Sequence, residues 1–189
     1  MRVLLVDNYD SFTYNLAQLI AEAGSKKIDI VKNDALKLAK VADYDKIVFS
    51  PGPGVPMEVP VMSEILATYA SHKSILGICL GHQAIACFYG AQLINLKHPL
   101  HGISSTLQIT NENESLFAGL SGNIAIGRYH SWVICEDTLP DCLLVTSQAE
   151  DGCIMSIAHR SMDVKGLQFH PESYITHDGK TMMKNWLEW

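Results

Sequence analysis

The sequence has 189 residues, of which 48% are hydrophobic and 18% charged, and its formal net charge is −6. This length and apolar content suit one domain, spanning residues 1–189, with a sizeable core. The acidic balance, without a cluster of lysine or arginine, argues against nucleic acid or an anionic membrane surface as a partner. The five cysteines are odd in number and form no CxxC pair. We therefore expect free thiols and a cytoplasmic location.

The first half of the chain alternates apolar runs with amphipathic segments, which is typical of strands and helices in turn. We predict strands at 2–7, 27–31, 46–49 and 74–78, and helical segments at 12–23, 35–41, 59–72 and 81–89. Asp10 or Ser11 can cap the first helix, and Gly24 can end it. This order predicts an open parallel sheet with helices on both faces, whose ligand sites lie beyond the carboxyl ends of the strands.

The segment Ile75–Ile94 contains no Asp, Glu, Lys or Arg over twenty residues. That is long enough for a membrane span. The segment also contains His82, two glutamines and three glycines. This polar content favours a buried strand followed by a buried helix, so we expect no membrane partner.

After Gly90 the pattern changes to short strands separated by turns. We predict strands at 92–96, 106–110, 124–127, 143–148, 154–159 and 166–169, and a last helix at 178–187. The predicted class is therefore α/β with three layers. A mostly parallel central sheet carries helices on both faces and has a small antiparallel extension.

The stretch LGICLGHQ at 76–83 places Cys79 two residues from a glycine on each side. It has the shape of the G-x-S-x-G elbow, in which a sharp strand-to-helix turn holds a nucleophile at its apex. The helix N-terminus there, and a protonated histidine nearby, would favour the thiolate. We predict that Cys79 is a nucleophile. The other cysteines, at 87, 135, 142 and 153, read as small apolar residues.

A base for Cys79 is predicted in the segment LQFHPE at 167–172. Residues i and i+2 of an extended segment point the same way, and Pro171 favours extended backbone at His170. Glu172 can then orient the imidazole, which gives a Cys-His-Glu triad. No role is predicted for the histidines at 82, 98, 101 and 159. Their spacing matches no compact zinc motif, and we expect no metal.

An oxyanion hole needs backbone N–H donors placed in advance. By analogy with the elbow, Leu80 supplies one donor. The loop SPGPG at 50–54 can supply the second, because Pro51 and Pro53 have no N–H and leave only Gly52 and Gly54. Gly52 lies nearest to the strand end and is the predicted second donor.

Together these motifs resemble the class I glutamine amidotransferases. The matching segments are SPGPG at 50–54, GICLGHQ at 77–83 and HPES at 170–173, and the resemblance covers essentially the whole chain. The segments VDNYDSFTYNL at 6–16 and RYHS at 128–131 are similar to the glutaminase subunits of anthranilate synthase and of aminodeoxychorismate synthase.

The resemblance implies a flavodoxin-like fold and a glutaminase without a cofactor. Cys79 would attack the side-chain amide of L-glutamine, release ammonia and form a thioester that water hydrolyses. His170 would act as general base and acid, and Glu172 would orient it. The residues implied to contact glutamine are Gly52, Pro53, Gly54, Gln83, Ser131 and Trp132. Gln83 lies one helical turn past Cys79, on the same face.

The resemblance also implies a partner, a larger chorismate-binding synthase subunit that receives the ammonia. The interpretation favoured here is the subunit of anthranilate synthase, in tryptophan biosynthesis. A subunit of aminodeoxychorismate synthase, in folate biosynthesis, or one that serves both enzymes stays open, because the motifs are shared.

Three positions depart from the family pattern. Trp132 stands where Leu is usual, Ile103 stands where a lysine follows His-Gly, and Tyr174 follows HPES where an aliphatic residue is usual. Two other function classes also stay open. The loop Asp7–Asn15 could bind the phosphate of a flavin, and a cysteine hydrolase could act on γ-glutamyl peptides.

Overall fold

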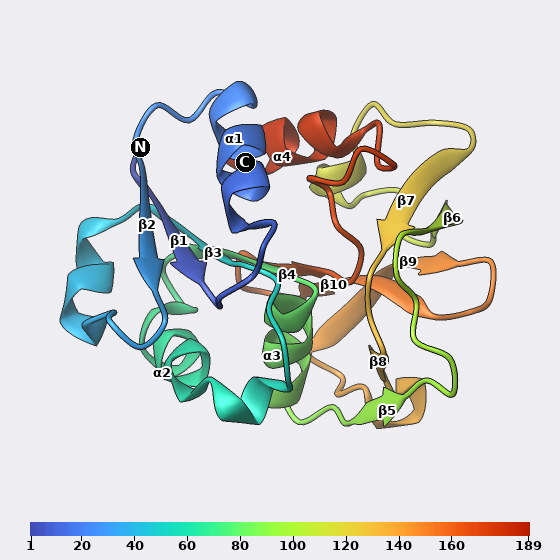
Figure 1. The fold of residues 1–189 in the computed structure, drawn as a ribbon, viewed down its shortest axis with the longest axis horizontal. Coiled ribbons are helices and arrows are strands. Elements are labelled where there is room, and N and C mark those ends of the chain that lie inside the picture. The colour runs from blue at the N-terminus through green and yellow to red at the C-terminus, as the bar shows by residue number, and fades with distance from the viewer.

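The computed structural model describes residues 1–189 and is built around one nine-stranded sheet (Figure 1). The strand order is β2-β1-β3-β4-β11-β10-β9-β6-β7. The first five strands in that order run parallel: β2 (Ile28–Lys32), β1 (Val3–Asp7), β3 (Lys46–Phe49), β4 (Ser74–Ile78) and β11 (Val164–Leu167). Every residue of β1, β3 and β11 is buried, as expected of strands covered on both faces. The predicted parallel sheet is confirmed.

The antiparallel extension continues the same sheet. It consists of β10 (Ile154–His159), β9 (Leu143–Ala149), β6 (Ile103–Ile109) and β7 (Ile124–Arg128). A separate two-stranded sheet pairs β5 (Leu93–Asn95) with β8 (Trp132–Ile134). The sequence did not predict β8, a three-residue strand that is too short to show a period. β11 begins two residues before the predicted strand and lies beside β4, next to the turn that contains Cys79.

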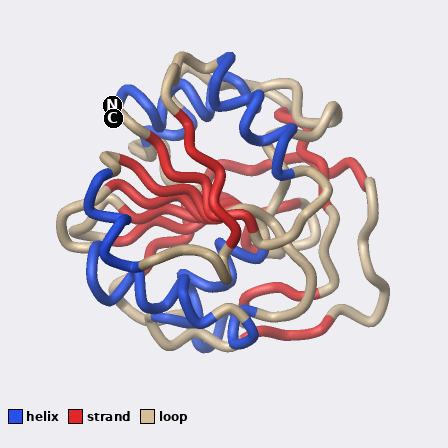
Figure 2. Tube along the Cα trace, turned by 60° about the vertical axis from the view of Figure 1, so that its left-hand side comes forward, coloured by secondary structure: helices blue, strands red, loops and turns tan.

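Helices cover both faces of the sheet and complete the three layers (Figure 2). They are α1 (Thr13–Glu22), α2 (Pro60–Tyr69), α3 (Leu80–Phe88) and α4 (Gly179–Glu188). α1 and α4 lie on one face, and α2 and α3 lie on the other (Figure 1). Alternate residues of β1 enter two apolar clusters, Leu5 with Trp186 of α4 and Leu4 with Ile65 of α2.

Helix boundaries differ from the predictions where the local sequence interrupts a helix. The predicted piece at 35–41 is a 3₁₀ segment, Leu38–Asp43. α2 starts at Pro60, because proline suits the first position of a helix, where no N–H is needed. α1 starts at Thr13, two residues after Ser11, and Asp10 Oδ1 accepts a hydrogen bond from the N–H of Phe12 at 2.7 Å.

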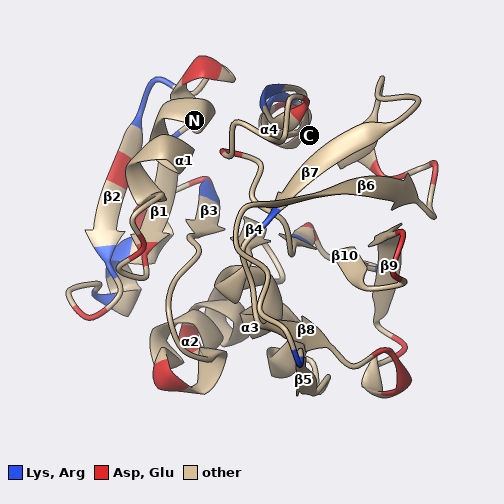
Figure 3. Ribbon diagram, turned by 45° about the vertical axis from the view of Figure 1, so that its right-hand side comes forward, with Lys and Arg blue, Asp and Glu red and all other residues tan.

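The uncharged run at 75–94 is divided among β4, α3 and β5, which form separate short elements. No helix in the structure has the length and apolar character that a membrane span requires. Charged residues of both signs are spread over loops, helices and strand ends (Figure 3).

The loops after β1 and β3 are joined at the carboxyl edge of the parallel strands. The N–H of Asn8 donates to Ser50 Oγ at 2.8 Å, and Asn8 Nδ2 donates to the carbonyl of Ser50 at 2.9 Å. This edge is where the sequence predicts the site.

Candidate active site

Cys79 lies between β4 and α3 in a strained backbone conformation. Its φ is 51°, in the left-handed region that residues other than glycine rarely adopt. A Cβ at Gly77 would overlap the carbonyl group of Gly81, and a Cβ at Gly81 would lie 2.6 Å from the Cβ of Phe49. Both glycines are therefore needed, because α3 starts directly against β3 and β4. This is the elbow that the glycine spacing predicts.

The exchange Gly81→Ala should destabilise the fold by about 3 kcal/mol or more, because the new methyl group meets Phe49 at less than a van der Waals distance. Urea unfolding, followed by circular dichroism, measures the loss. Gly119→Ala is the matched control. An alanine is strained at the φ of 77° found there, but no atom lies within 4 Å of the added Cβ. An equal loss in the two variants would contradict the close approach of α3 to β3.

His170 and Glu172 form a buried pair after β11. His170 Nδ1 lies 2.7 Å from Glu172 Oε1, and their side chains are 3% and 0% exposed. The N–H of His170 donates to the carbonyl of Gly127 at 3.0 Å, and Thr176 Oγ1 donates to the carbonyl of His170 at 2.7 Å. The backbone of His170 is therefore held through both its N–H and its carbonyl group.

Cys79 is the neighbour on the other side of the imidazole, where His170 Nε2 is buried and makes no hydrogen bond within the protein. Burial alone would lower the pKa of His170, but the nearby Cys79 sulfur and the Glu172 carboxylate at Nδ1 outweigh it and hold that pKa well above its usual value. The triad residues predicted from separate motifs are thus brought together. A thiol, an imidazole and a carboxylate in this order can carry out nucleophilic acyl transfer.

The predicted oxyanion-hole residues also meet. A Cβ at Gly52 would lie 2.9 Å from Leu80 Cδ2 and 2.7 Å from the carbonyl oxygen of Asn8, so the Gly52 backbone is packed against the start of α3. Leu80 is the first residue of α3, where a backbone N–H has no carbonyl within the helix to bond. Gly52 and Leu80 line the same cavity as Cys79.

A cavity of about 210 Å³ opens beside Cys79. The residues that line it include all six of the predicted glutamine contacts: Gly52, Pro53, Gly54, Gln83, Ser131 and Trp132. Cys79, Leu80, Tyr129 and His130 complete the wall. Gln83 Nε2 donates to the carbonyl of Trp132 at 3.0 Å, which ties α3 to the strand β8 across the cavity.

The sequence profile of the family described as "Glutamine amidotransferase class-I" matches residues 4–189. The chain belongs to the class I glutamine amidotransferases. Its match to the profile covers the elbow, the His170–Glu172 pair and every residue that lines the cavity.

Curated relatives of this amidotransferase extend over nearly the full length of both chains. Aminodeoxychorismate synthase component 2 of Escherichia coli is 42% identical over 98% of this chain and 98% of its own. Anthranilate synthase component 2 of Thermus thermophilus is 41% identical over 100% and 92%. Aminodeoxychorismate/anthranilate synthase component 2 of Bacillus subtilis is 38% identical over 98% and 95%.

The fold of the amidotransferase is also similar to a solved structure. A crystal structure described as that of a GMP synthase subunit from Thermoplasma acidophilum superimposes with a TM-score of 0.88 at 26% identity. The alignment covers 100% of this chain and 92% of that one. The predicted fold class is confirmed.

Three residues near Cys79 were missed by sequence reasoning. Tyr129 has its carbonyl oxygen 4.0 Å from the sulfur and its ring 4.9 Å from that of His170, between ring centroids. His130 lines the cavity, and burial together with the charge of Arg128 lowers its pKa to about 4, so it is neutral at pH 7. Gln168 Nε2 lies 3.6 Å from the sulfur. Gln168 stands two residues before His170 in an extended segment, and that spacing is a signal that could have indicated it.

The departures from the family pattern do not disturb the triad. Trp132 takes part through its backbone carbonyl, which any residue provides. The side chain of Tyr174 is 83% exposed and that of Ile103 is 47% exposed. In the loop suggested for a flavin phosphate, Asp7 accepts from Tyr9 and Thr13, and the Asp10 carboxylate occupies the start of α1. An anionic ligand would meet these carboxylates.

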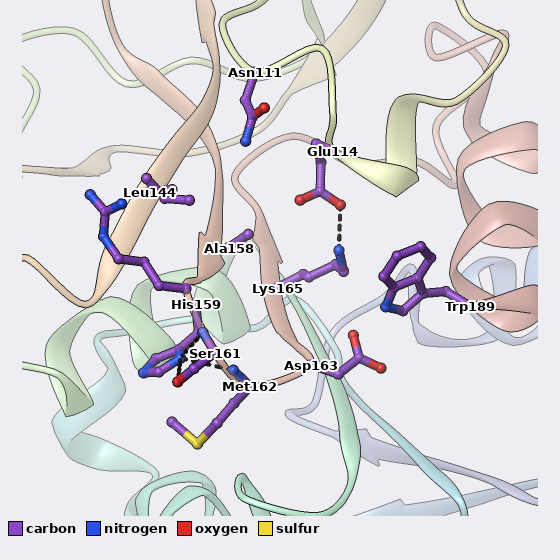
Figure 4. Close-up of a pocket in the computed structure, with 11 residues that line it drawn as sticks. Asn111, Glu114, Leu144, Ala158, His159, Ser161, Met162, Asp163, Lys165 and Trp189 are labelled. Atoms are coloured by element: carbon purple, nitrogen blue, oxygen red, sulfur yellow. Dashed lines mark hydrogen bonds and ion pairs between the residues drawn. The ribbon is translucent and has the colours of Figure 1, made fainter.

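A larger cavity, of about 370 Å³, lies near the amino-terminal ends of β4 and β11, away from Cys79 (Figure 4). Lys165 and Glu114 face each other there as a buried ion pair at 2.5 Å, with Trp189 beside them (Figure 4). The buried charges of Lys165 and Glu114 neutralise each other. No cysteine or other activated nucleophile lines this larger cavity. The smaller cavity at Cys79 is therefore the candidate active site.

Proposed function

We propose that this amidotransferase is the glutaminase subunit of a chorismate-using synthase. It would hydrolyse L-glutamine to glutamate and ammonia and pass the ammonia to a larger partner subunit. The observation that carries the proposal is the cavity beside Cys79, because the nucleophile lines it together with backbone and amide groups, and the His170–Glu172 pair adjoins that nucleophile. Residues 1–189 would act as a single glutaminase domain, in the cytoplasm, where its five free cysteines stay reduced.

In the first half of the reaction, the Cys79 sulfur attacks the side-chain carbonyl carbon of glutamine as a thiolate, whose proton is already on His170 Nε2 because the pKa of His170 is raised. The carbonyl electron pair moves to oxygen, and the N–H groups of Gly52 and Leu80 stabilise the resulting oxyanion. When the oxyanion collapses, the C–N bond breaks and His170 returns the proton to the leaving nitrogen. Ammonia leaves, and a γ-glutamyl thioester remains on Cys79.

In the second half, His170 takes a proton from water, and the hydroxide adds to the thioester carbon. Collapse of the second oxyanion breaks the C–S bond and releases glutamate. The proton taken from water stays on His170, which restores the starting pair of thiolate and imidazolium. Glu172 holds the imidazole by Nδ1 throughout and stabilises its protonated form.

Substrate orientation depends on Gln83. Both hydrogens of its Nε2 are used inside the protein, one by the carbonyl of Trp132 and one by Gln168 Oε1. Only Oε1 remains for the ligand, and a carbonyl oxygen accepts hydrogen bonds. Gln83 would therefore take the α-ammonium group of glutamine, while backbone groups of the Gly52–Gly54 and Ser131–Trp132 segments meet its other polar groups.

Relatives named for anthranilate synthase, for aminodeoxychorismate synthase and for both support a chorismate-using partner. We favour the anthranilate synthase assignment, in tryptophan biosynthesis. The alternative is aminodeoxychorismate synthase, in folate biosynthesis, or a subunit shared by both enzymes.

The test mixes the chain with each candidate partner, giving glutamine as the sole nitrogen source. We expect anthranilate to form with the anthranilate synthase partner. Formation of aminodeoxychorismate instead would give the alternative pathway, and formation of both products would give the shared subunit. If no glutamine-dependent product forms with either partner, while both partners work with added ammonia, the proposed function is wrong.

A further inference from the structure

A second amide lies directly under the nucleophile. Gln168 follows β11 and is completely buried. Its Nε2 lies 3.6 Å from the sulfur of Cys79, within hydrogen-bond reach of a sulfur atom, and its Oε1 accepts from Gln83 Nε2 at 3.2 Å. The roles given above use only its Oε1, as the acceptor for Gln83, and leave its Nε2 without one.

The orientation of the Gln168 amide is dictated by its neighbours. The carbonyl of Trp132 can only accept, so Gln83 must turn its Nε2 toward it. That nitrogen also faces Gln168, and it can only donate, so Gln168 must present Oε1 to it. Gln168 Nε2 is then left facing the sulfur. The carbonyl of Trp132 thus sets the orientation of the Gln83 amide, and Gln83 sets that of Gln168. As a result, a hydrogen-bond donor points at the Cys79 sulfur.

We propose that Gln168 is a further catalytic residue of the glutaminase function proposed above, which holds the Cys79 sulfur in its thiolate form. A donor that points at a titratable group favours the charged form. The carbonyl of Tyr129, 4.0 Å away on the same sulfur, is an acceptor and suits the neutral S–H. The sulfur therefore has one partner for each protonation state, and Gln168 is the partner of the reactive one.

The test follows alkylation of Cys79 by iodoacetamide as a function of pH, with peptide mass spectrometry to separate Cys79 from the other four cysteines. Gln168→Met keeps the length of the side chain and removes the donor. Gln168→Glu keeps an acceptor for Gln83 and places oxygen against the sulfur. Gln148→Met, a half-buried glutamine on β9 that bonds the carbonyl of Gly152, is the matched control.

We expect the pH midpoint of alkylation to rise by about one unit in Gln168→Met, the size of one charge-assisted hydrogen bond. It should rise further in Gln168→Glu and stay unchanged in Gln148→Met. At high pH, where every chain is thiolate, Gln168→Met should react at least as fast as wild type, because a less stabilised thiolate is the better nucleophile. Glutamine hydrolysis at pH 7 should lose about tenfold in kcat, with little change in KM.

An unchanged alkylation midpoint in a folded Gln168→Met chain would overturn the proposal. Should that variant fail to fold, Gln168→Glu decides in the same way. The alkylation assay needs no glutamine, so it separates the two hypotheses. Suppose that the alkylation midpoint differs between wild type and Gln168→Met, but the wild-type chain hydrolyses no glutamine, with or without partner. That result would contradict the proposed function and leave the role of Gln168 on the thiolate intact.

Discussion

Replacement of Cys79 by alanine is expected to lower kcat/KM for glutamine hydrolysis by about 10⁴-fold or more. The reaction proposed here forms a covalent bond to the sulfur, and no other cysteine lines the cavity. Ammonia release from glutamine, measured with the partner present, gives the rate. Product formation from added ammonium salt should be unchanged, because that route bypasses the glutaminase site.

The fold of the Cys79→Ala chain should be preserved, since alanine has the same backbone strain as cysteine at a φ of 51°. Cys79→Gly is a useful companion. It removes the strain as well as the sulfur. Its free energy of unfolding, measured with urea, should exceed that of Cys79→Ala by about 1 kcal/mol. Residual glutaminase activity above about a thousandth of wild type in either variant would contradict the role of Cys79.

Exchange of Glu172 for glutamine is expected to lower kcat/KM by between about 10²- and 10⁴-fold. The amide keeps the size of the side chain and removes the charge that faces His170 Nδ1 at 2.7 Å. It can no longer stabilise the imidazolium that forms when Cys79 gives up its proton. Glu64→Gln, on the exposed face of α2, is the matched control and should keep full activity.

The same variant should change the pH profile in a defined direction. In wild type, Cys79 and Glu172 hold the pKa of His170 well above its usual value, against the effect of burial. The imidazolium that protonates the leaving ammonia therefore persists through neutral pH, and activity falls once the pH rises through that pKa. Glu172→Gln removes one cause of the raised pKa, so the alkaline fall in kcat/KM should move to lower pH. A move to higher pH would contradict the effect of the Glu172 charge on the pKa of His170.

Much of the site could be predicted from the sequence because its parts carry local signals. Two glycines around Cys79 predict a tight turn, and the structure shows that a Cβ at either would overlap backbone or side-chain atoms. A proline after His170 predicts extended backbone that puts His170 and Glu172 on one side. The structure brings them together by a turn instead, in which the N–H of Ser173 donates to the carbonyl of His170 at 3.2 Å. The strand order then brings these segments together, since ligand sites gather at the carboxyl ends of parallel strands.

What the sequence did not reveal depends on contacts between distant segments. Gln168 gains its position from Gln83 and Trp132, which lie 85 and 36 residues away in the chain. Tyr129, which follows β7, packs against His170, which lies beyond the end of β11. The place of β11 beside β4 is also non-local, because a four-residue strand carries no sign of which neighbour it will pair with.

The central claim is that Cys79 forms a thioester with glutamine, and the most direct measurement is its detection. The chain is mixed with glutamine, quenched with acid within the first turnovers and digested for peptide mass spectrometry. We expect a γ-glutamyl group on the peptide that contains Cys79, absent from Cys79→Ala and enriched in Glu172→Gln if hydrolysis of the thioester is slowed more than its formation. Glutamine turnover without any adduct on Cys79, under conditions that preserve thioesters, would contradict the account.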